Sequence, residues 1–254
     1  MERKGLVTRR VFLSRTSRAA VVGVATMRGT AWAAPSGNQT SRVVLVRDSA
    51  VFREDETLDT SVLGQMLDTA VQELFNADSP EDAWKRVVQP GDVVGIKSNV
   101  AGPPRTPPEL EGIIRERVTR AGVDGAKVGV DDRGVLRNPI FQTATALINV
   151  RPMRSHHWAG VGSLLKNYIM FSENPPSWHD DSCANLAGLW DLPIVRGKTR
   201  LNVLVMLSPL FHSKGPHNYN KAYVWSYKGL LVGTDPVAVD ATGLRIIEAK
   251  RREF

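Results

Sequence analysis

The chain has 254 residues, of which 42% are hydrophobic and 23% charged, and this composition excludes a disordered, collagen-like or repeat-built protein. Its single cysteine, Cys183, excludes an internal disulfide, a four-cysteine zinc site and an iron–sulfur cluster held by cysteines of this chain alone. The formal charge of +7 comes mostly from residues 1–33, which hold seven Lys and Arg against one Glu and leave +1 for the remainder. A nucleic-acid partner is therefore not expected.

Residues 1–33 have the three-part layout of a secretory signal peptide. The paired Arg9 and Arg10 precede an apolar pair as in a twin-arginine motif, and a nine-residue apolar run (19–27) is followed by Ala31-Trp32-Ala33, a typical cleavage site. The alternative is a basic segment with a chance arginine pair. We expect export in the folded state by the twin-arginine machinery, with an extracytoplasmic or periplasmic location. Such a short apolar run leaves no integral membrane segment after cleavage.

After a linker at 34–41, residues 42–254 are predicted to form one α/β domain. Apolar runs predict strands and helical spacing predicts helices. The expected strands are 43–46, 93–96, 128–130, 147–150 and 201–207, and the expected helices are 58–74, 109–121, 139–145 and 236–252. This alternation predicts a mostly parallel sheet with helices on both faces, similar to a Rossmann fold. Gly160-Val161-Gly162 lacks the dinucleotide fingerprint, so NAD is not expected.

Polar residues follow three successive predicted strands. Lys97 and Asn99 follow the second strand, Asp131 ends the third, and Asn149 lies in the fourth. Ligands in such folds bind beyond the carboxyl ends of the strands, so these side chains are candidates for one site. The alternative for each residue is an ordinary turn or helix cap.

All five histidines lie between residues 156 and 217. Three interpretations remain open: a metal site, proton transfer or substrate contact, and structural hydrogen bonding. His156, His157, His179 and Asp180 are the candidate metal ligands, and a divalent metal is the candidate cofactor, although no recognised zinc spacing is present. For Cys183 a buried structural thiol is favoured over a nucleophile.

Arg154, Lys166 and Asn167 surround a short helix expected to begin near Gly160. Cations together with helix amides favour a bound carboxylate or phosphate. A solvated basic surface is the alternative. Asp235-Pro236 is expected to cap the last helix, which has no stop signal before Phe254 and therefore suggests a truncated chain.

Four segments together resemble the domain-of-unknown-function 362 family. They are 90–99, 121–132, 148–167 and 233–240, in that order along nearly all of the chain after residue 41. The resemblance implies a family of bacterial and archaeal proteins, some exported, without a general assigned activity. In the third segment Arg151-Pro152 replaces the family's Pro-Lys, Arg154 stands for its second lysine, and His156 keeps the histidine place. Many relatives carry a ferredoxin-like cluster domain, which the cysteine count excludes here.

These observations lead to one functional hypothesis and one rival. The hypothesis is a metal- or cofactor-assisted enzyme that acts on a small anionic molecule. Its expected catalytic residues are His156, Asp131, Lys97 and Lys166, and its expected binding residues are Asn99, Asn149, Arg154 and Asn167. The rival is a non-catalytic extracytoplasmic protein that binds an anion or a metal in the same pocket.

Overall fold

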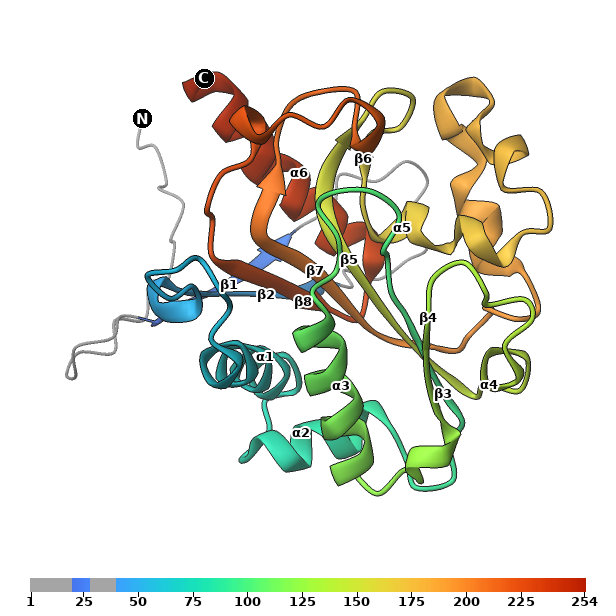
Figure 1. Ribbon diagram of the computed structural model, residues 1–254. Helices are drawn as coiled ribbons and strands as arrows, with labels where there is room; N and C mark the ends of the chain where they lie inside the picture. Colours follow the sequence, from blue (N-terminus) through green and yellow to red (C-terminus); the bar gives the residue numbers. More distant parts are fainter. Residues whose placement is uncertain (1–19, 28–39) are drawn as a thin grey trace, which may run out of the picture.

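A computed structural model of the protein describes residues 20–27 and 40–254, and it contains one mixed sheet of eight strands (Figure 1). Across the sheet the order is β1-β2-β8-β7-β5-β3-β4, and the short β6 pairs with β5. The strands are β1 (Ala20–Met27), β2 (Ser41–Asp48), β3 (Val94–Lys97), β4 (Val128–Asp131), β5 (Ala146–His156), β6 (Gly160–Gly162), β7 (Thr199–Leu210) and β8 (Gly229–Gly233).

The strand directions confirm the predicted fold class. Strands β4, β3, β5 and β7 pair in parallel. Strand β8 is antiparallel to both β7 and β2, so β2 runs in the same direction as the parallel group. Helices follow most of these strands in the chain, as an α/β fold requires. The carboxyl ends of β3, β4, β5 and β7 therefore lie at one edge of the sheet.

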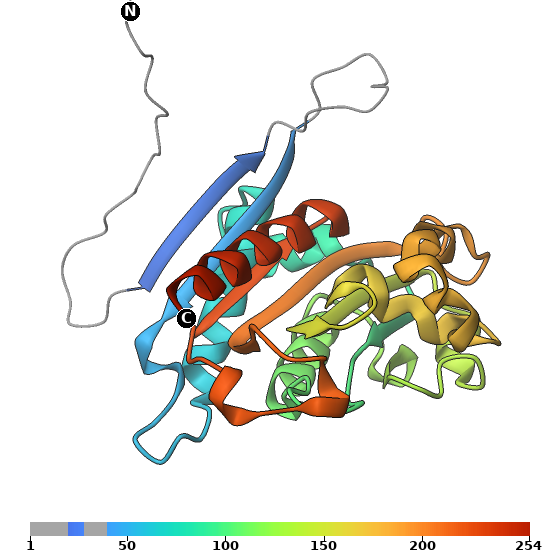
Figure 2. The same ribbon diagram turned by 90° about the horizontal axis from the view of Figure 1, so that it is seen from above.

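Helices cover both faces of the sheet, as Figure 2 shows. Alternate residues of the strands feed two cores: Val44 and Val46 pack with α1, α2 and α3, whereas Val43 packs with α6. The helices are α1 (Thr60–Phe75), α2 (Pro80–Val87), α3 (Pro108–Arg120), α4 (Pro139–Gln142), α5 (Leu164–Asn167) and α6 (Pro236–Glu253). Asp235 caps α6 through the amides of Val237 and Ala238, as predicted. No helix in the described residues is long and apolar enough to cross a membrane.

The structure adds elements that the sequence did not indicate and corrects one. Helix α2 and strand β8 were not predicted, and β8 lies between β2 and β7. The expected helix start near Gly160 is wrong, because residues 160–162 form β6 and the helix begins at Leu164. Pairing of Gly160 with His156 in an antiparallel register explains the difference.

The predicted signal peptide lies largely outside the described residues. Arg9, Arg10 and the Ala31–Ala33 site belong to that part of the chain. The backbone of the apolar run is described as β1, which pairs antiparallel with β2 at the edge of the sheet. If the chain is cut after Ala33, the strand order from β2 to β4 stays the same.

Candidate functional site

A row of polar residues crosses four neighbouring strands in register. Asp131 in β4 pairs with Lys97 in β3, Lys97 with Asn149 in β5, and Asn149 with Asn202 in β7. Asn149, Lys97 and Asn202 have no measurable exposure. Adjacent parallel strands in register bring these positions of separate strands to one edge of the sheet.

Lys97 forms a buried ion pair with Asp132. Its Nζ lies 2.7 Å from Oδ1 of Asp132, and the two side chains are 0% and 3% exposed. Burial lowers the pKa of Lys97 to about 8, although Asp132 opposes that shift. The other oxygen of Asp132 accepts the amide of Val100. Lys97 is thus an anchored cation whose partner is Asp132.

Asp131, which we expected to act as a ligand or base, has a different local role. Its carboxylate accepts the amide of Gly134 at 2.8 Å and Nδ2 of Asn138 at 3.0 Å. These bonds hold the turn that follows β4, which is the capping alternative. We expected the acid of this site to be Asp131, the last residue of β4. In the structure the carboxylate that contacts Lys97 is that of the next residue, Asp132.

Asn167 joins the polar row to α5. Its Nδ2 donates to Oδ1 of Asn149 at 2.8 Å and to the carbonyls of Lys97 and Val150 at 3.1 Å. Its Oδ1 accepts from Nζ of Lys97 at 3.3 Å and from Nδ2 of Asn99 at 3.4 Å. The three predicted asparagines therefore form one buried network with Lys97. Within this network Oδ1 of Asn99 is buried and has no hydrogen-bond partner.

Arg151 is a buried guanidinium that makes no hydrogen bond or ion pair with the described residues. It is 4% exposed, and its Nε is buried without a partner. Burial and the neighbouring charge of Arg154 lower the pKa of Arg151 to about 9. An arginine taken out of water is costly unless an anion accompanies it. Sequence reasoning noticed Arg151 only as a departure from the family pattern.

Arg154, 3% exposed, fastens the loop that follows β3. Its Nη1 donates to the carbonyls of Ala101 and Gly102 at 2.9 Å and to that of Pro104 at 3.2 Å, while its Nε is buried and unpartnered. Burial lowers the pKa of Arg154 to about 10. Nη1 of Arg154 thus supports the loop, whereas Nε has no hydrogen-bond partner among the described residues.

Lys166 is held by His179 and Cys183. Its Nζ lies 2.8 Å from Nε2 of His179 and 3.8 Å from Sγ of Cys183, and no salt bridge to a described carboxylate is formed. The residue is 3% exposed. Burial, aided by the charges of Arg151 and Arg154, lowers its pKa to about 8. Cys183, interpreted from the sequence as a structural thiol, is therefore a neighbour of the predicted catalytic lysine.

His156 is the last residue of β5 and is 8% exposed. Burial, followed by the charge of Lys166, lowers the pKa of His156 to about 3, so the ring is neutral near pH 7. Its Nδ1 accepts the amides of Trp158 and Ala159, both at 3.3 Å. We call Arg151, Arg154 and Lys166, together with the neutral ring of His156 beside them, the cationic cluster.

The predicted metal ligands come together only in part. The ring centroid of His156 lies 5.1 Å from that of His157 and 5.8 Å from that of His179. However, the nitrogens of His179 are engaged by Lys166 and the carbonyl of Pro176, and His157 Nδ1 contacts the carbonyl of Lys214. No group of three or more His, Cys, Asp or Glu among the described residues is arranged to hold a metal ion. The donor set, including exposed Asp180, therefore does not fit a metal as it stands.

Asp240 is a further buried acid that sequence reasoning did not place near the site. It reaches from α6 to the start of α5, where it accepts Oγ of Ser163 at 2.7 Å and the amides of Leu164 and Leu165 at 3.0 and 2.9 Å. Burial raises the pKa of Asp240 to about 6. This carboxylate fixes the helix that carries Lys166 and Asn167.

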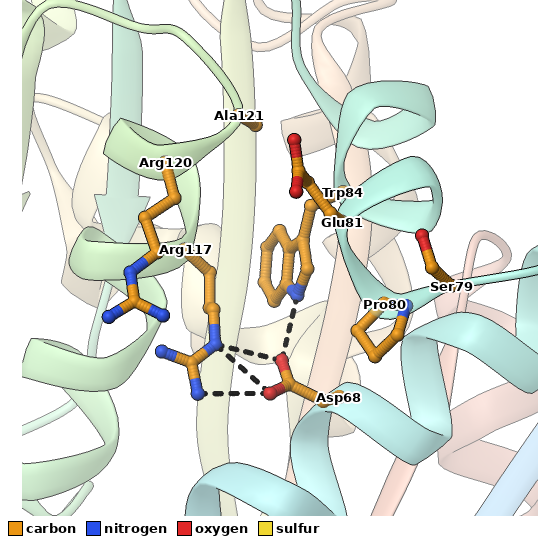
Figure 3. A pocket seen from close by; sticks show the side chains of 8 residues that line it. All are labelled: Asp68, Ser79, Pro80, Glu81, Trp84, Arg117, Arg120 and Ala121. Atoms are coloured by element: carbon orange, nitrogen blue, oxygen red, sulfur yellow. Dashed lines mark hydrogen bonds and ion pairs between the residues drawn. The ribbon is translucent and has the colours of Figure 1, made fainter.

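A cavity of about 520 Å³ lies elsewhere in the described residues. Figure 3 shows it between α1, α2 and α3, with Asp68 bonded to both Arg117 and Trp84. Nε of Arg117 lies 2.9 Å from Oδ1 of Asp68, and Nη2 lies 2.9 Å from Oδ2. This paired arrangement ties three helices together, and it shares no residue with the polar row.

Comparison with known families decides the classification. The model of the family described as domain of unknown function (DUF362) matches residues 94–245, more than half of the chain. The chain belongs to this family. The match covers the polar row, the cationic cluster and most of α6, so the site lies inside the family domain. Neither a curated protein nor a solved structure matches the chain.

Proposed function

We propose that this DUF362 protein binds a small anionic molecule at the cationic cluster. The observation that supports the proposal is Arg151, a buried guanidinium without a hydrogen bond or ion pair to any described residue. A bound carboxylate or phosphate would restore the interactions that this side chain lost on leaving water. Arginine presents a planar fork of donors that matches such oxyanions.

The surroundings of Arg151 favour an anion over a cation or a neutral ligand. The charges of Arg151 and Lys166 lower the pKa of His156, and those of Arg151 and Arg154 lower the pKa of Lys166. Burial is the largest cause of both shifts, and the neighbouring positive charges add to it. An anion placed among Arg151, Arg154 and Lys166 lowers the energy of their charged forms.

The binding test uses thermal unfolding with phosphate, sulfate and acetate, at ionic strength matched with NaCl. A ligand at 100 times its Kd should stabilise the protein by about 2.7 kcal/mol. Arg151→Met should abolish the saturable part of the shift. Arg200→Met, which changes an exposed arginine in β7, should leave it unchanged. Shifts that follow only ionic strength, or that persist in Arg151→Met, would refute the anion site.

We also propose that the protein acts outside the cytoplasm after export by the twin-arginine machinery. The arginine pair, the short apolar run and the Ala-x-Ala site support this. Replacing Arg9 and Arg10 by Lys should block export, and the N-terminus of the exported form should be Ala34. Export that continues through the general unfolded-chain route would contradict this part of the proposal.

A catalytic role is the second candidate function, and it is favoured by the lowered pKa of Lys166. An amine whose pKa lies at about 8 exchanges protons near physiological pH. Metal assistance, the original hypothesis, has a direct check: metal analysis of the exported protein should find stoichiometric metal if it is right. Absence of bound metal together with saturable anion binding would favour a metal-free site.

A further inference from the structure

A second cavity, of about 160 Å³, lies between the segments that follow β2 and β3 and the second halves of β5 and β7. It shares no residue with the cationic cluster or with the polar row. Its lining consists of apolar and proline side chains with two polar ones: Phe52, Leu58, Pro104, Arg105, Pro107, Pro152, Val205, Leu207 and Ser208. Open α/β sheets bind ligands near the carboxyl ends of their strands, so the cavity has the location of a binding site.

The cavity lies where the pairing of β5 with β7 is interrupted. Pro152 of β5 pairs with Val205 of β7. The next pair along the two strands is Arg154 with Leu210, because the register shifts between these points. Proline has no amide hydrogen to donate to a ladder. The residues of β7 between the two pairs include Ser208, which lines the cavity, so the hollow follows from the course of this strand.

Two walls of the cavity are held in place by contacts within the fold. Nη1 of Arg154 donates to the carbonyl of Pro104 at 3.2 Å and so fastens the loop that follows β3. Phe52 forms an isolated antiparallel bridge with Leu58 in the segment that follows β2. A ligand that enters between such walls loses little free energy in ordering them.

The two polar side chains of the lining can both donate hydrogen bonds, and both lack a partner. Arg105 is exposed and makes no hydrogen bond or ion pair with any described residue, and the hydroxyl of the half-buried Ser208 makes none either. Asp and Glu are absent from the described residues that line the cavity. A guanidinium and a hydroxyl match the oxygens of a carboxylate, so charge complementarity indicates an anionic group beside Arg105.

The volume and the apolar walls determine the rest of the ligand. Val205 and Leu207 are each 3% exposed, and Leu58 completes this apolar side. An apolar cavity of about 150 Å³ is large enough to bind benzene. The present cavity therefore accepts a phenyl ring, whereas a polar body would lose its hydrogen bonds to water on entering.

We propose that this cavity binds a small monocarboxylate with an apolar body the size of a phenyl ring. The ring occupies the cavity, and the carboxylate accepts hydrogen bonds from Arg105 and Ser208. The site is independent of the anion site at Arg151, because the two share no residue. The protein then has two anion sites, of which this one alone selects for an apolar group on the ligand.

The test is titration calorimetry of phenylacetate with the full chain, at ionic strength matched with NaCl. The titration is run on wild type and on Arg151→Met, in which the first anion site is removed. We expect a saturable site, one per chain, that persists in Arg151→Met. Acetate, which lacks the ring, and benzyl alcohol, which lacks the carboxylate, should each bind there roughly tenfold more weakly or less.

Variants of the lining locate the ligand. Arg105→Met should weaken phenylacetate binding roughly tenfold, because a charge-assisted hydrogen bond is lost. Leu58→Trp, which fills the cavity, should abolish binding, and the exposed Arg200→Met is the matched control that should leave it unchanged. Nuclear Overhauser contacts from the ring protons to the methyl groups of Val205 and Leu207 place the ligand in wild type, even if Leu58→Trp does not fold.

The outcomes separate this inference from the anion site. Binding that persists in Arg151→Met and weakens in Arg105→Met supports the cavity site, whether or not phosphate binds at Arg151. Binding that is lost in Arg151→Met but kept in Arg105→Met would place the carboxylate at the cationic cluster and overturn the inference. Equal binding of benzyl alcohol, or no contact between the ring and the methyl groups of Val205 and Leu207, would also overturn it.

Discussion

Replacing Asp132 by Asn should destabilise the protein by leaving the ammonium of Lys97 buried without its counter-charge. The side chains of this pair are 0% and 3% exposed, and their atoms lie 2.7 Å apart. Breaking a buried pair by removing one partner costs about 3–5 kcal/mol. In a domain of this size each kcal/mol lowers the melting temperature by roughly 2–4 °C, so a loss on the order of 10 °C is expected near pH 7.

The destabilisation caused by Asp132→Asn should become smaller as the pH rises. The pKa of Lys97 is about 8 in the folded protein, below the ordinary lysine value of 10.5. The unfolded chain therefore binds more protons between these values, and this group's contribution to stability increases with pH across that window. Without Asp132 the folded pKa falls further, so the variant begins to recover at lower pH. Once Lys97 is neutral, it no longer needs the counter-charge of Asp132.

The measurement is urea unfolding of wild type and Asp132→Asn at pH 7 and pH 9.5. Asp131→Asn is the matched control, because Asp131 is the preceding residue and caps a turn. Its loss should be about 1 kcal/mol and should change much less with pH, because the charge of Asp131 acts more weakly on the pKa of Lys97 than that of Asp132 does. A destabilisation of Asp132→Asn below about 1 kcal/mol, or one equal at both pH values, would refute the buried-charge reasoning.

Three further predictions concern residues around the site and away from it. Gly162→Ala should weaken phosphate binding by roughly tenfold, about 1.4 kcal/mol by titration calorimetry, because its Cβ lies 3.1 Å from Nη2 of Arg151; unchanged affinity would contradict this. The free energy of unfolding of the wild type should fall by up to about 3 kcal/mol relative to that of Asp240→Asn as the pH rises from 4 to 6. The reason is that burial raises the pKa of Asp240 to about 6, so the folded state binds a proton that the unfolded chain has released; parallel stability curves of the two proteins would disprove this. Arg117→Met should cost about 1–3 kcal/mol in urea unfolding without changing anion binding, because its bonds to Asp68 join helices far from the cluster; altered binding would give the cavity of Figure 3 a functional role.

The sequence predicted most of the fold because apolar periodicity is a local signal. The parallel group and helices α1, α3 and α6 follow directly from such runs. Strand β8 (Gly229–Gly233) was missed, and its position between β2 and β7 is set by tertiary pairing, which a local pattern does not show. The extension of β5 to His156 was missed because polar residues there are buried, which no pattern of hydrophobicity can indicate.

The candidate site was predicted by location more successfully than by role. Parallel strand ends bring together Lys97, Asn99 and Asn149, and Asn167 joins them by hydrogen bonds from α5. The choice between Asp131 and Asp132 depends on the turn after β4, which sequence spacing does not determine. Arg151 was passed over because an exposed and a buried arginine look the same in a sequence.

The buried charges of the described chain indicate what kind of anion fits. Four buried cations, Lys97, Arg151, Arg154 and Lys166, accompany two buried carboxylates, Asp132 and Asp240. Asp132 forms an ion pair with Lys97, whereas Asp240 accepts a hydrogen bond from the amide of Leu164 at the start of α5. Nη1 of Arg154 donates to three backbone carbonyls, and Nζ of Lys166 lies 2.8 Å from Nε2 of His179. The charges of Asp132 and Asp240 act on Arg151 without forming an ion pair with it, and a single carboxylate is the group that would bind it directly.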